Sequence, residues 1–504
     1  MIFPFLKKMA FVLFASLIVI IFILMKYVDK LRNKRFYELL KQFPSYPKLP
    51  LFGNYLMARV SPKDRMRTME NIMRPHRRLL FWLGPFPVIV LKKYDDIIAI
   101  LNQSQDRDQF LNLGDEWLGT GIINANYDEW KKSRKILAPA FSSIMLSRYV
   151  DVFNKKASLL ADSFEATADS GEVFNIRETL VKTNLDIIIE NTIGVPIDSL
   201  GEEGKQFADA VPQALYNIGK RMTRPWLYPS FIHKMYLKLT GKENIIQQYR
   251  NLPAKIVKDA LNNHKNQKDL EENDISSKSI ISLIVKGGLQ EPTFTETRMT
   301  DELIQIIIGG SETSELNVGY TLLMLAMHQD IQQKVYEEVC ELFKNNESLT
   351  ADHLLHQLKY LEQCIKETTR KYSHATITVR RTHKECILGD NTIIPANITV
   401  VPLLHLANQD PELYKNPEKW DPEHFSDDAV ENRPKGSFMS FGSGPRSCLG
   451  GRYAIMSIKT QIAYVIRKYH LSTNIKELTR DNLSIFLSIG SKIGYPIIFT
   501  RRMP

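Results

Sequence analysis

Hydrophobic residues follow three different patterns along this chain. From Met9 to Met25 they form a continuous run in which Ser16 is the only polar residue. From about Tyr127 to the 340s they recur with helical spacing, and short β-type runs appear at Phe81 to Leu91 and beyond Arg380. The pattern predicts a mainly α fold with a small β region, preceded by an N-terminal transmembrane helix.

The N-terminal run has the length of a membrane anchor, since about 20 residues cross a bilayer. Lys7 and Lys8 precede it, and the heavier positive flank follows it, which predicts a cytosolic body. No small-residue cleavage signal follows Met25, so an uncleaved anchor is favoured over a signal peptide.

The pattern divides the chain into three parts. Residues 1–30 are expected to form the anchor, and residues 31–54 a basic linker with a stiff hinge that contains Pro44, Pro47 and Pro50. Residues 55–504 show no composition shift and are expected to form one domain. Within it, the polar stretch from Asn262 to Lys278 is predicted to be a solvated loop.

One long helix is predicted from Thr293 to His328, with Thr293 and Glu296 at capping-box spacing. The adjacent Gly309 and Gly310 interrupt it, and each costs about 1 kcal/mol relative to alanine inside a helix. Either a ligand lies against an open stretch of backbone, or another helix crosses there. Glu312 and Thr313 follow directly and could form a proton relay.

The segment Phe441–Gly450 places Cys448 in a glycine-rich loop, two residues after Arg446. Gly442, Gly444 and Gly450 allow positive φ and a close approach to a flat cofactor. Backbone N–H groups and a nearby cation stabilise a thiolate, the form of cysteine that binds metals. The segment therefore indicates a metal-ligand cysteine; the alternative is a buried structural cysteine.

Two weaker motifs each place a pair of charged or polar side chains on one helix face. Glu367 and Arg370 share a face of a helix predicted from Leu358 to Lys371. Trp130 and Arg134, four residues apart, offer an indole N–H and a guanidinium to carboxylates. Arg380 or Arg381 could add a further donor.

Composition adds limited information. The 504 residues carry a formal charge of +10, which suggests an acidic partner or an anionic membrane surface, and no basic-aromatic pattern indicates nucleic acid. The four cysteines form no dense framework, so a reducing compartment is expected.

Together these motifs resemble the cytochrome P450 family of membrane-anchored haem-thiolate monooxygenases. The cysteine loop matches that family's signature, Phe-x-x-Gly-x-Arg-x-Cys-x-Gly, at every fixed position. The segments Glu116–Ile123 and Arg134–Phe141 look like the family-four clan. The resemblance implies a P450-like fold whose long central helix lies over the haem.

The resemblance also implies roles for single residues. Cys448 would be the iron ligand, and Thr313 and Glu312 would deliver protons to dioxygen. Glu367, Arg370 and His424 would be structural, with His424 standing where the family usually has arginine. The residues implied to surround the haem are Trp130, Arg134, Arg380, Phe441, Gly444, Arg446 and Gly450.

The implied cofactor is haem b. It would be bound non-covalently, because Gly309 replaces the glutamate that joins haem in many family-four members. The implied reaction inserts an oxygen atom from dioxygen into a lipophilic substrate: a fatty acid, a hormone-like lipid or a xenobiotic. Electrons would come from NADPH–cytochrome P450 reductase, with cytochrome b5 as a further partner, at the endoplasmic reticulum membrane. Two alternatives remain open: a reductase-independent haem-thiolate isomerase or dehydratase, and a non-catalytic membrane protein that binds haem or a lipophile.

An acidic reductase would need a basic docking face. We expect this face to be formed by Lys131, Lys132, Lys135, Arg446 and Arg452.

Overall fold

The computed structural model describes residues 28–49, 53–54, 57, 64–266, 279–344, 346–485 and 488–502. The predicted anchor from Met9 to Met25 and part of the predicted proline hinge lie outside these residues. Among the residues described, no single helix is long and apolar enough to cross a membrane. The helical stretches Tyr127–Phe141 and Ser143–Thr167 pass that test only as a pair bent by 60°.

The predicted mainly helical architecture is confirmed. The helices are α2 (Lys34–Leu40), α4 (Arg65–Met73), α5 (Tyr94–Gln103), α6 (Asp115–Leu118), α7 (Tyr127–Leu137), α8 (Ser143–Asp162), α9 (Arg177–Ile193), α10 (Gly201–Met222), α11 (Ser230–Leu239), α12 (Lys242–Asn266), α13 (Ile280–Leu289), α14 (Glu296–Met327), α15 (Gln329–Phe343), α16 (Lys359–Lys371), α17 (Leu404–Ala407), α18 (Asp427–Glu431) and α19 (Gly451–Lys468).

The strands form small sheets beside the helices. They are β1 (Arg78–Leu83), β2 (Phe86–Leu91), β3 (Phe174–Asn175), β4 (Arg380–Arg381), β5 (Cys386–Ile387), β6 (Ile393–Ile394), β7 (Thr399–Pro402), β8 (Tyr469–Ser472), β9 (Leu483–Ile485), β10 (Ile489–Ser491) and β11 (Pro496–Arg501).

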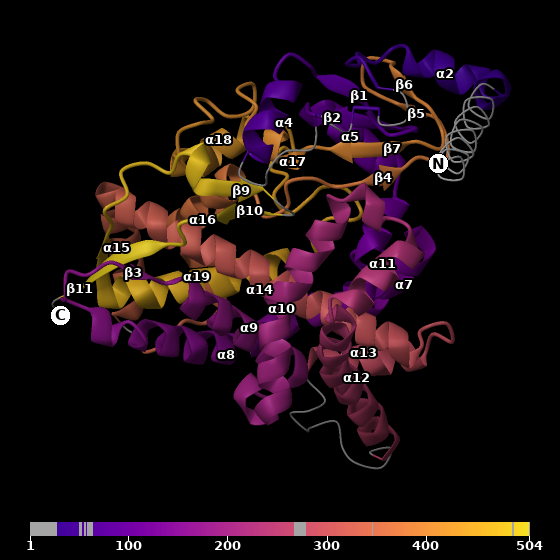
Figure 1. Ribbon diagram of the computed structural model, residues 1–504. Helices are drawn as coiled ribbons and strands as arrows, with labels where there is room; N and C mark the ends of the chain where they lie inside the picture. The colour runs from indigo at the N-terminus through magenta and orange to yellow at the C-terminus, as the bar shows by residue number, and fades with distance from the viewer. Residues whose placement is uncertain are drawn as a thin grey trace, which may run out of the picture.

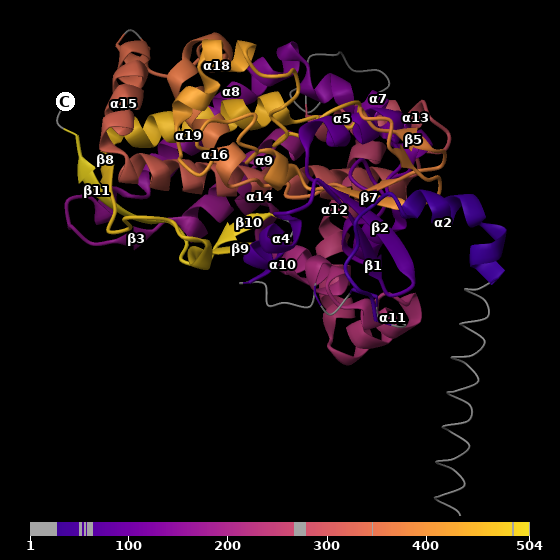
Figure 2. The same cartoon turned by 90° about the horizontal axis from the view of Figure 1, so that it is seen from above.

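The largest sheet has the strand order β1-β2-β7-β4. Its first two strands include the short strands predicted between Phe81 and Leu91 and pair as a hairpin, and β7 pairs parallel to β2. The sheet lies at one end of the molecule, and the long helices fill the other end (Figures 1 and 2). Because β4 is the last strand of the sheet and pairs with β7, residues 380 and 381 lie against β7.

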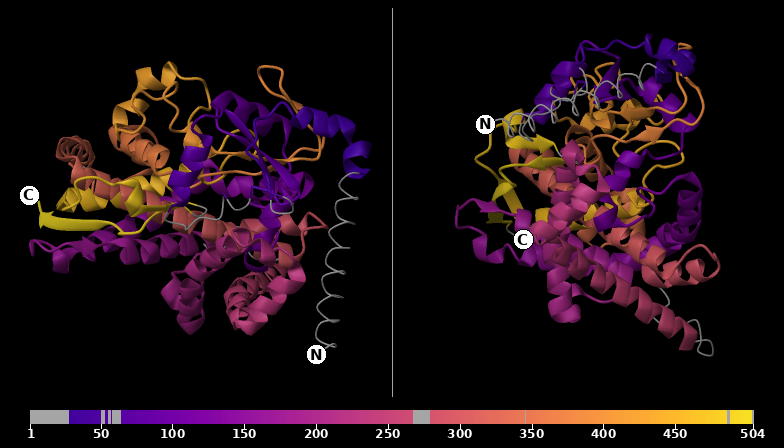
Figure 3. Two further views of the ribbon diagram at one scale, coloured as in Figure 1. Left: turned by 45° about the horizontal axis from the view of Figure 1, so that its top comes forward. Right: turned by 45° about the vertical axis from the view of Figure 1, so that its right-hand side comes forward.

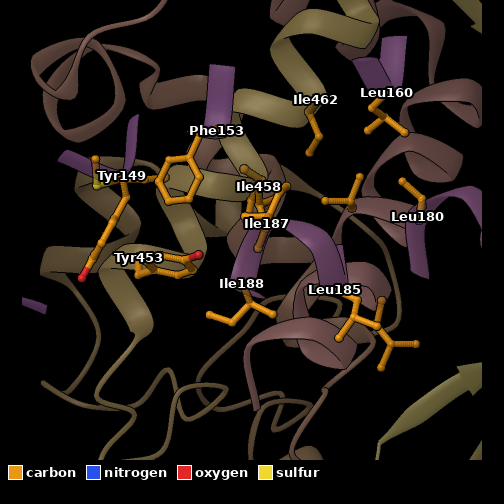
Figure 4. Packing of buried hydrophobic residues seen from close by; sticks show 14 of the residues in the cluster. Tyr149, Phe153, Leu160, Leu180, Leu185, Ile187, Ile188, Tyr453, Ile458 and Ile462 are labelled. Carbon is orange, nitrogen blue, oxygen red and sulfur yellow. The ribbon is translucent and has the colours of Figure 1, made fainter. Parts of the chain in front are cut away.

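The helical part is organised around α14, which crosses the middle of the molecule (Figure 1). It packs against α9, α12, α16 and α19, and α19 packs in turn against α8. Figure 4 shows the apolar contacts near this centre, where Phe153 of α8 and Ile188 of α9 approach Tyr453 of α19. The rings of Phe153 and Tyr453 meet edge to face at 5.0 Å.

Two local predictions about helix ends were wrong. The long helix begins at Glu296, and its N-cap is Thr295, whose side chain accepts a hydrogen bond from the Arg298 N–H at 3.2 Å. Thr293 lies outside the helix and donates to Glu291 instead, so the capping box predicted with Glu296 is not formed. Helix α12 continues to Asn266, into the stretch predicted to be a loop, and residues 267–278 are outside the description.

Helices α10, α11 and α12 lie between residues 201 and 266. They form the magenta group on one face of the helical part (Figure 3). Charged contacts join this group to α6 and to α14. Arg221 of α10 pairs with Glu116, and Arg250 of α12 pairs with Asp301 of α14, while Asp301 also accepts from the Thr120 N–H at 2.9 Å.

Candidate functional site

The loop before α19 folds tightly around Cys448. The Cys448 N–H donates to the Phe441 carbonyl at 2.8 Å, which closes the loop on itself. Gly442 and Gly444 both have φ of 73°, a conformation that favours glycine. The expectation of positive φ was wrong for Gly450, which is the N-cap of α19 with φ −88°.

The Cys448 side chain is exposed, although it lies deep in the protein. A side chain with both properties faces an internal space. Burial raises the pKa of the Cys448 thiol, whereas a hydrogen bond from the Gly450 N–H and the charge of Arg134 lower it. The hydrogen bond and the charge of Arg134 both stabilise a thiolate. The loop therefore suits a metal ligand once a cation compensates for the cost of burial.

Three arginines gather near this loop without an ion-pair partner among the residues that the structure describes. Arg380 and Arg446 are buried, and buried nitrogens of Arg107, Arg380 and Arg446 have no hydrogen-bond partner in the described part of the chain. Arg107 and Arg380 both donate to the Thr378 hydroxyl. Since buried charges are normally paired, this cluster is suited to bind an anionic group.

Electrostatic repulsion is evident within the arginine cluster. Burial, together with the charge of Arg107, lowers the pKa of Arg446 to about 9. Burial also lowers the pKa of Arg380 well below its usual value, and both Arg107 and Arg446 contribute. Burial alone lowers the pKa of Arg107 to about 10. A bound anion would reverse these shifts, because it would favour the charged guanidinium groups.

The uncertainty between residues 380 and 381 has a clear geometric answer. Arg380 belongs to the buried cluster, whereas Arg381 is partly exposed and lies 3.7 Å from Asp108 and 3.3 Å from the Thr399 hydroxyl. Adjacent strand residues point to opposite faces of a sheet, so only one of them can reach the cluster.

Trp130 and Arg134 lie on α7, as predicted. The Arg446 guanidinium lies over the Trp130 ring at 4.8 Å, and Arg446 also donates to the Ala125 and Asn126 carbonyls at 2.7 and 2.9 Å. Arg134 donates to the Ser447 carbonyl at 2.9 Å, next to Cys448. Helix α7 is therefore attached to the cysteine loop at two points.

Arg446 does not belong to a surface docking face, so that part of the prediction was wrong. It is buried and bound to backbone carbonyls. Lys131, Lys135 and Arg452 are exposed, while Lys132 donates to Thr293 and lies 3.4 Å from Glu291.

Gly309 and Gly310 serve different purposes within an unbroken helix α14. A methyl group added at Gly310 would lie 2.8 Å from Ile188, so α9 crosses at this point. One added at Gly309 would meet nothing within 4 Å, and Gly309 is exposed although the residues that precede it on the helix are buried. The helix-crossing interpretation is therefore confirmed for Gly310, whereas Gly309 leaves open space where the other interpretation expects a ligand.

Glu312 and Thr313 follow the open position. The Thr313 hydroxyl donates to the Gly309 carbonyl at 2.7 Å. Glu312 accepts from the Ser488 hydroxyl at 3.2 Å. Burial raises the pKa of Glu312, which Ser488 and Arg177 partly offset. The acid and the hydroxyl thus lie one residue apart, beside an open stretch of helix backbone.

Glu367, Arg370 and His424 meet in one buried cluster. Arg370 donates to both Glu367 oxygens at 2.7 and 2.8 Å, and further to the Asn408 and Pro417 carbonyls. His424 lies between two acceptors, Glu367 Oε1 at 3.2 Å and the Lys415 carbonyl at 2.6 Å. The histidine therefore completes a three-member cluster that holds the segment leading to the cysteine loop.

Sequence reasoning missed Arg107 and His374. Both ring nitrogens of His374 are buried without a partner among the described residues, and burial lowers its pKa to about 3. Neither residue belongs to a local motif. Only the fold brings Arg107, which follows α5, to Thr378 before β4.

Comparison with known proteins identifies the family. A family model described as Cytochrome P450 matches residues 44–494. The chain belongs to the cytochrome P450 family. This P450 is a haem-thiolate monooxygenase, and membership implies haem, dioxygen, a lipophilic substrate and a redox partner.

Relatives with family-four names cover most of the chain, which confirms the predicted clan. Cytochrome P450 4c21 of Blattella germanica is 28% identical over 91% of this chain and 93% of its own length. Probable cytochrome P450 4aa1 of Drosophila melanogaster is 27% identical over 84% of this chain and 83% of its own. Cytochrome P450 4V2 of Homo sapiens is 23% identical over 85% of this chain and 83% of its own length.

Proposed function

We propose that Cys448 is the thiolate ligand of a non-covalently bound haem b, and that the buried arginine cluster receives its propionates. The cluster carries this proposal, because three guanidinium groups that have no ion-pair partner within the described part of the chain need anions. Arg446 links the cluster to Cys448, since the two residues share one loop. Gly309 offers no carboxylate for an ester bond to the haem.

The residues around the haem divide into three groups. Arg107, Arg380 and Arg446 bind the propionates, and Trp130 and Arg134 add donors from α7. Phe441 and Gly444 shape the loop, with Gly450 donating its N–H to the sulfur. Glu367, Arg370 and His424 keep the preceding segment in place.

Bound haem with a thiolate ligand supplies the chemistry of O–O bond cleavage. The protein must then deliver protons and exclude bulk water. Thr313 can hold a water molecule at the open face of α14, and Glu312 can pass it a proton. The substrate is a lipophilic molecule such as a fatty acid, a hormone-like lipid or a xenobiotic, because buried apolar residues such as Ile308 flank the open position.

Electrons come from NADPH through a cytochrome P450 reductase, with cytochrome b5 as a further donor. The exposed Lys131 and Lys135 support this proposal, because α7 also carries Arg134, which contacts the cysteine loop. A basic surface over this helix would bring an acidic partner close to the haem.

Reduction kinetics with NADPH and the reductase test the proposed function. Replacing Lys131 and Lys135 with glutamate should slow haem reduction and increase its salt dependence, while the haem spectrum stays intact. The matched control, Lys205→Glu with Lys258→Glu, changes exposed lysines of α10 and α12 and should have no effect. Turnover without NADPH, or unchanged reduction in the Lys131 and Lys135 variant, contradicts the proposal.

We further propose that residues 1–30 anchor the protein in the endoplasmic reticulum membrane, that residues 31–54 form the linker and hinge, and that residues 55–504 form the catalytic domain. An exposed apolar surface on and before α11 supports the membrane location. Its residues are Trp226, Phe231, Ile232, Met235 and Leu239. Lys234 and Lys238 lie among them, as in helices that rest on an anionic bilayer.

A further inference from the structure

A second buried acid, Glu315, lies one helical turn beyond Glu312 on α14. It is 3% exposed, and its Oε1 atom has no hydrogen-bond partner within the described residues. Residues three apart share a helix face, so Glu312 and Glu315 point to the same side. Nothing in the haem site described above makes use of Glu315.

Two tyrosine hydroxyls beside Glu315 are also buried polar groups without a well-formed hydrogen bond. Tyr320 and Tyr495 are fully buried, and their rings meet edge to face at 5.2 Å. Neither hydroxyl makes a well-formed hydrogen bond in the described part of the protein, although the Tyr495 hydroxyl lies close enough to Glu315 to lower the pKa of that carboxyl group. Buried polar groups in folded proteins are nearly always hydrogen-bonded to protein or to ordered water. Three such atoms in one cluster are therefore suited to hold ordered water.

The cluster reaches the solvent through Arg177. This residue begins α9, is exposed, and donates to the Ser491 carbonyl at 3.2 Å. Its charge opposes the rise in pKa of both Glu312 and Glu315, so it faces both acids. At the other end, Glu312 is bound to Ser488, which lies just before β10.

The charged and titratable groups that face Glu315 come from three elements. They are Glu312 on α14, Arg177 on α9 and Tyr495 just before β11. Burial raises the pKa of Glu315, Arg177 and Tyr495 oppose the rise, Glu312 adds to it, and the net result is a pKa of about 8. Glu315 is therefore largely protonated near neutral pH and can give up a proton there.

We propose that Glu315, with Tyr495 and ordered water, carries protons from the solvent at Arg177 to Glu312. This inference rests on the proposed role of Glu312 and Thr313. Each turnover consumes one dioxygen, two electrons from NADPH and two protons; one oxygen atom enters the substrate and the other leaves as water. Each proton that Glu312 passes on is replaced from Glu315, which takes another from solvent. Glu315 does not touch the reacting atoms and acts only through Glu312.

Glu315→Gln and Tyr495→Phe test the proposal, because each removes a proton-carrying group at nearly constant volume. Tyr372→Phe is the matched control. Tyr372 is also buried and stacks on Tyr320 at 4.4 Å, but its hydroxyl contacts the Met324 sulfur. Glu312→Gln reports separately on the proposed function.

The measurement compares NADPH oxidation and peroxide release in light and heavy water, with the reductase and dodecanoic acid as the probe. Glu315→Gln should lower the coupled rate about tenfold, a modest general acid–base effect. It should also release more peroxide, show a larger solvent isotope effect and leave the haem spectrum unchanged. Tyr495→Phe should act in the same direction, and Tyr372→Phe should match the wild type.

An infrared titration gives a readout that needs no turnover. The component of the protonated-carboxyl band that titrates near pH 8 should be present in the wild type and absent in Glu315→Gln. A wild-type rate and isotope effect in Glu315→Gln, with loss of activity in Glu312→Gln, overturns the relay but leaves the proposed function standing. A wild-type isotope effect in Glu312→Gln overturns both.

Discussion

At the scale of single residues, Arg107, Arg380 and Arg446 carry the proposed haem site. They share a small volume, repel one another and lack ion-pair partners in the described residues. The cluster is therefore unfavourable until an anion binds, and binding then gains both hydrogen bonds and relief of repulsion. Loss of one arginine should therefore weaken haem binding but stabilise the haem-free protein.

Arg380→Gln should weaken haem retention about tenfold, as expected for the loss of a charge-assisted hydrogen bond. The same variant should stabilise the haem-free protein, because one repelling charge is gone. The measurements are the rate of haem transfer to apomyoglobin and the denaturation midpoint of the haem-free protein.

Arg381→Gln is the matched control, because Arg381 is the next residue and pairs with Asp108. It should leave haem retention unchanged. Equal effects of the two substitutions would mean that the buried cluster does not hold the propionates.

Some of the site residues could be predicted from the sequence, and others could not. Cys448, Arg446 and the glycines lie within one short segment, so their spacing was readable. Glu367 and Arg370 share one turn of helix and were readable for the same reason. Arg107, His374 and Glu315 belong to no local pattern, and their burial depends on segments distant in the chain. Arg446 was expected both beside the haem and in a surface docking face, and only its burial in the fold excludes the docking face.

At the scale of elements, α14 combines a packing surface with an open surface within two residues. Gly310 allows α9 to approach, while Gly309 leaves room beside Thr313. The sequence indicated a reason for the glycine pair but could not assign the two reasons, because either residue suits either purpose. The helix and strand types were predictable from periodicity, whereas the start of α14 depended on a choice between two neighbouring threonines.

Gly310→Ala should destabilise the protein by about 1–3 kcal/mol, because the added methyl group overlaps Ile188. Gly309→Ala should not destabilise it, since alanine is favoured over glycine by about 1 kcal/mol inside a helix and meets open space. Chemical denaturation of both variants provides the comparison.

Gly309→Ala should instead change the spectral shift that lipophilic molecules induce in the haem. If the two variants were equally destabilised, Gly309 would not face an open space.

At the scale of the whole molecule, buried acids make stability depend on pH. The folded-state pKa of Glu315 is about 8, above its ordinary value of 4.5. The unfolded chain therefore binds fewer protons between these values, and the contribution to stability, complete below about pH 4.5, is lost as pH rises toward about 8. Glu312 acts in the same direction.

Glu315→Gln should flatten this pH dependence, so that the variant gains stability relative to the wild type above about pH 8. Denaturation midpoints across this range measure the effect. Glu178→Gln changes an exposed acid of α9 and should keep the wild-type slope. An unchanged slope in Glu315→Gln would show that Glu315 is ionised in the folded protein.

The apolar surface of α11 concerns the whole molecule as well. A chain without residues 1–30 should still bind anionic vesicles weakly through Phe231 and Leu239, which are 76% and 78% exposed. Changing both to serine should abolish the remaining binding in a vesicle flotation assay. Ile144→Ser with Leu159→Ser removes comparable exposed apolar residues of α8 and should have no effect. Equal losses in both variants would contradict a specific membrane surface.

The most direct test of the account is the carbon monoxide difference spectrum of the reduced protein, recorded beside a Cys448→Ser variant. The wild type should show a Soret band at the position diagnostic of a thiolate ligand, and Cys448→Ser should lose it. A histidine-type band in the wild type, or a thiolate-type band that survives in Cys448→Ser, would contradict the assignment of Cys448 as the haem ligand.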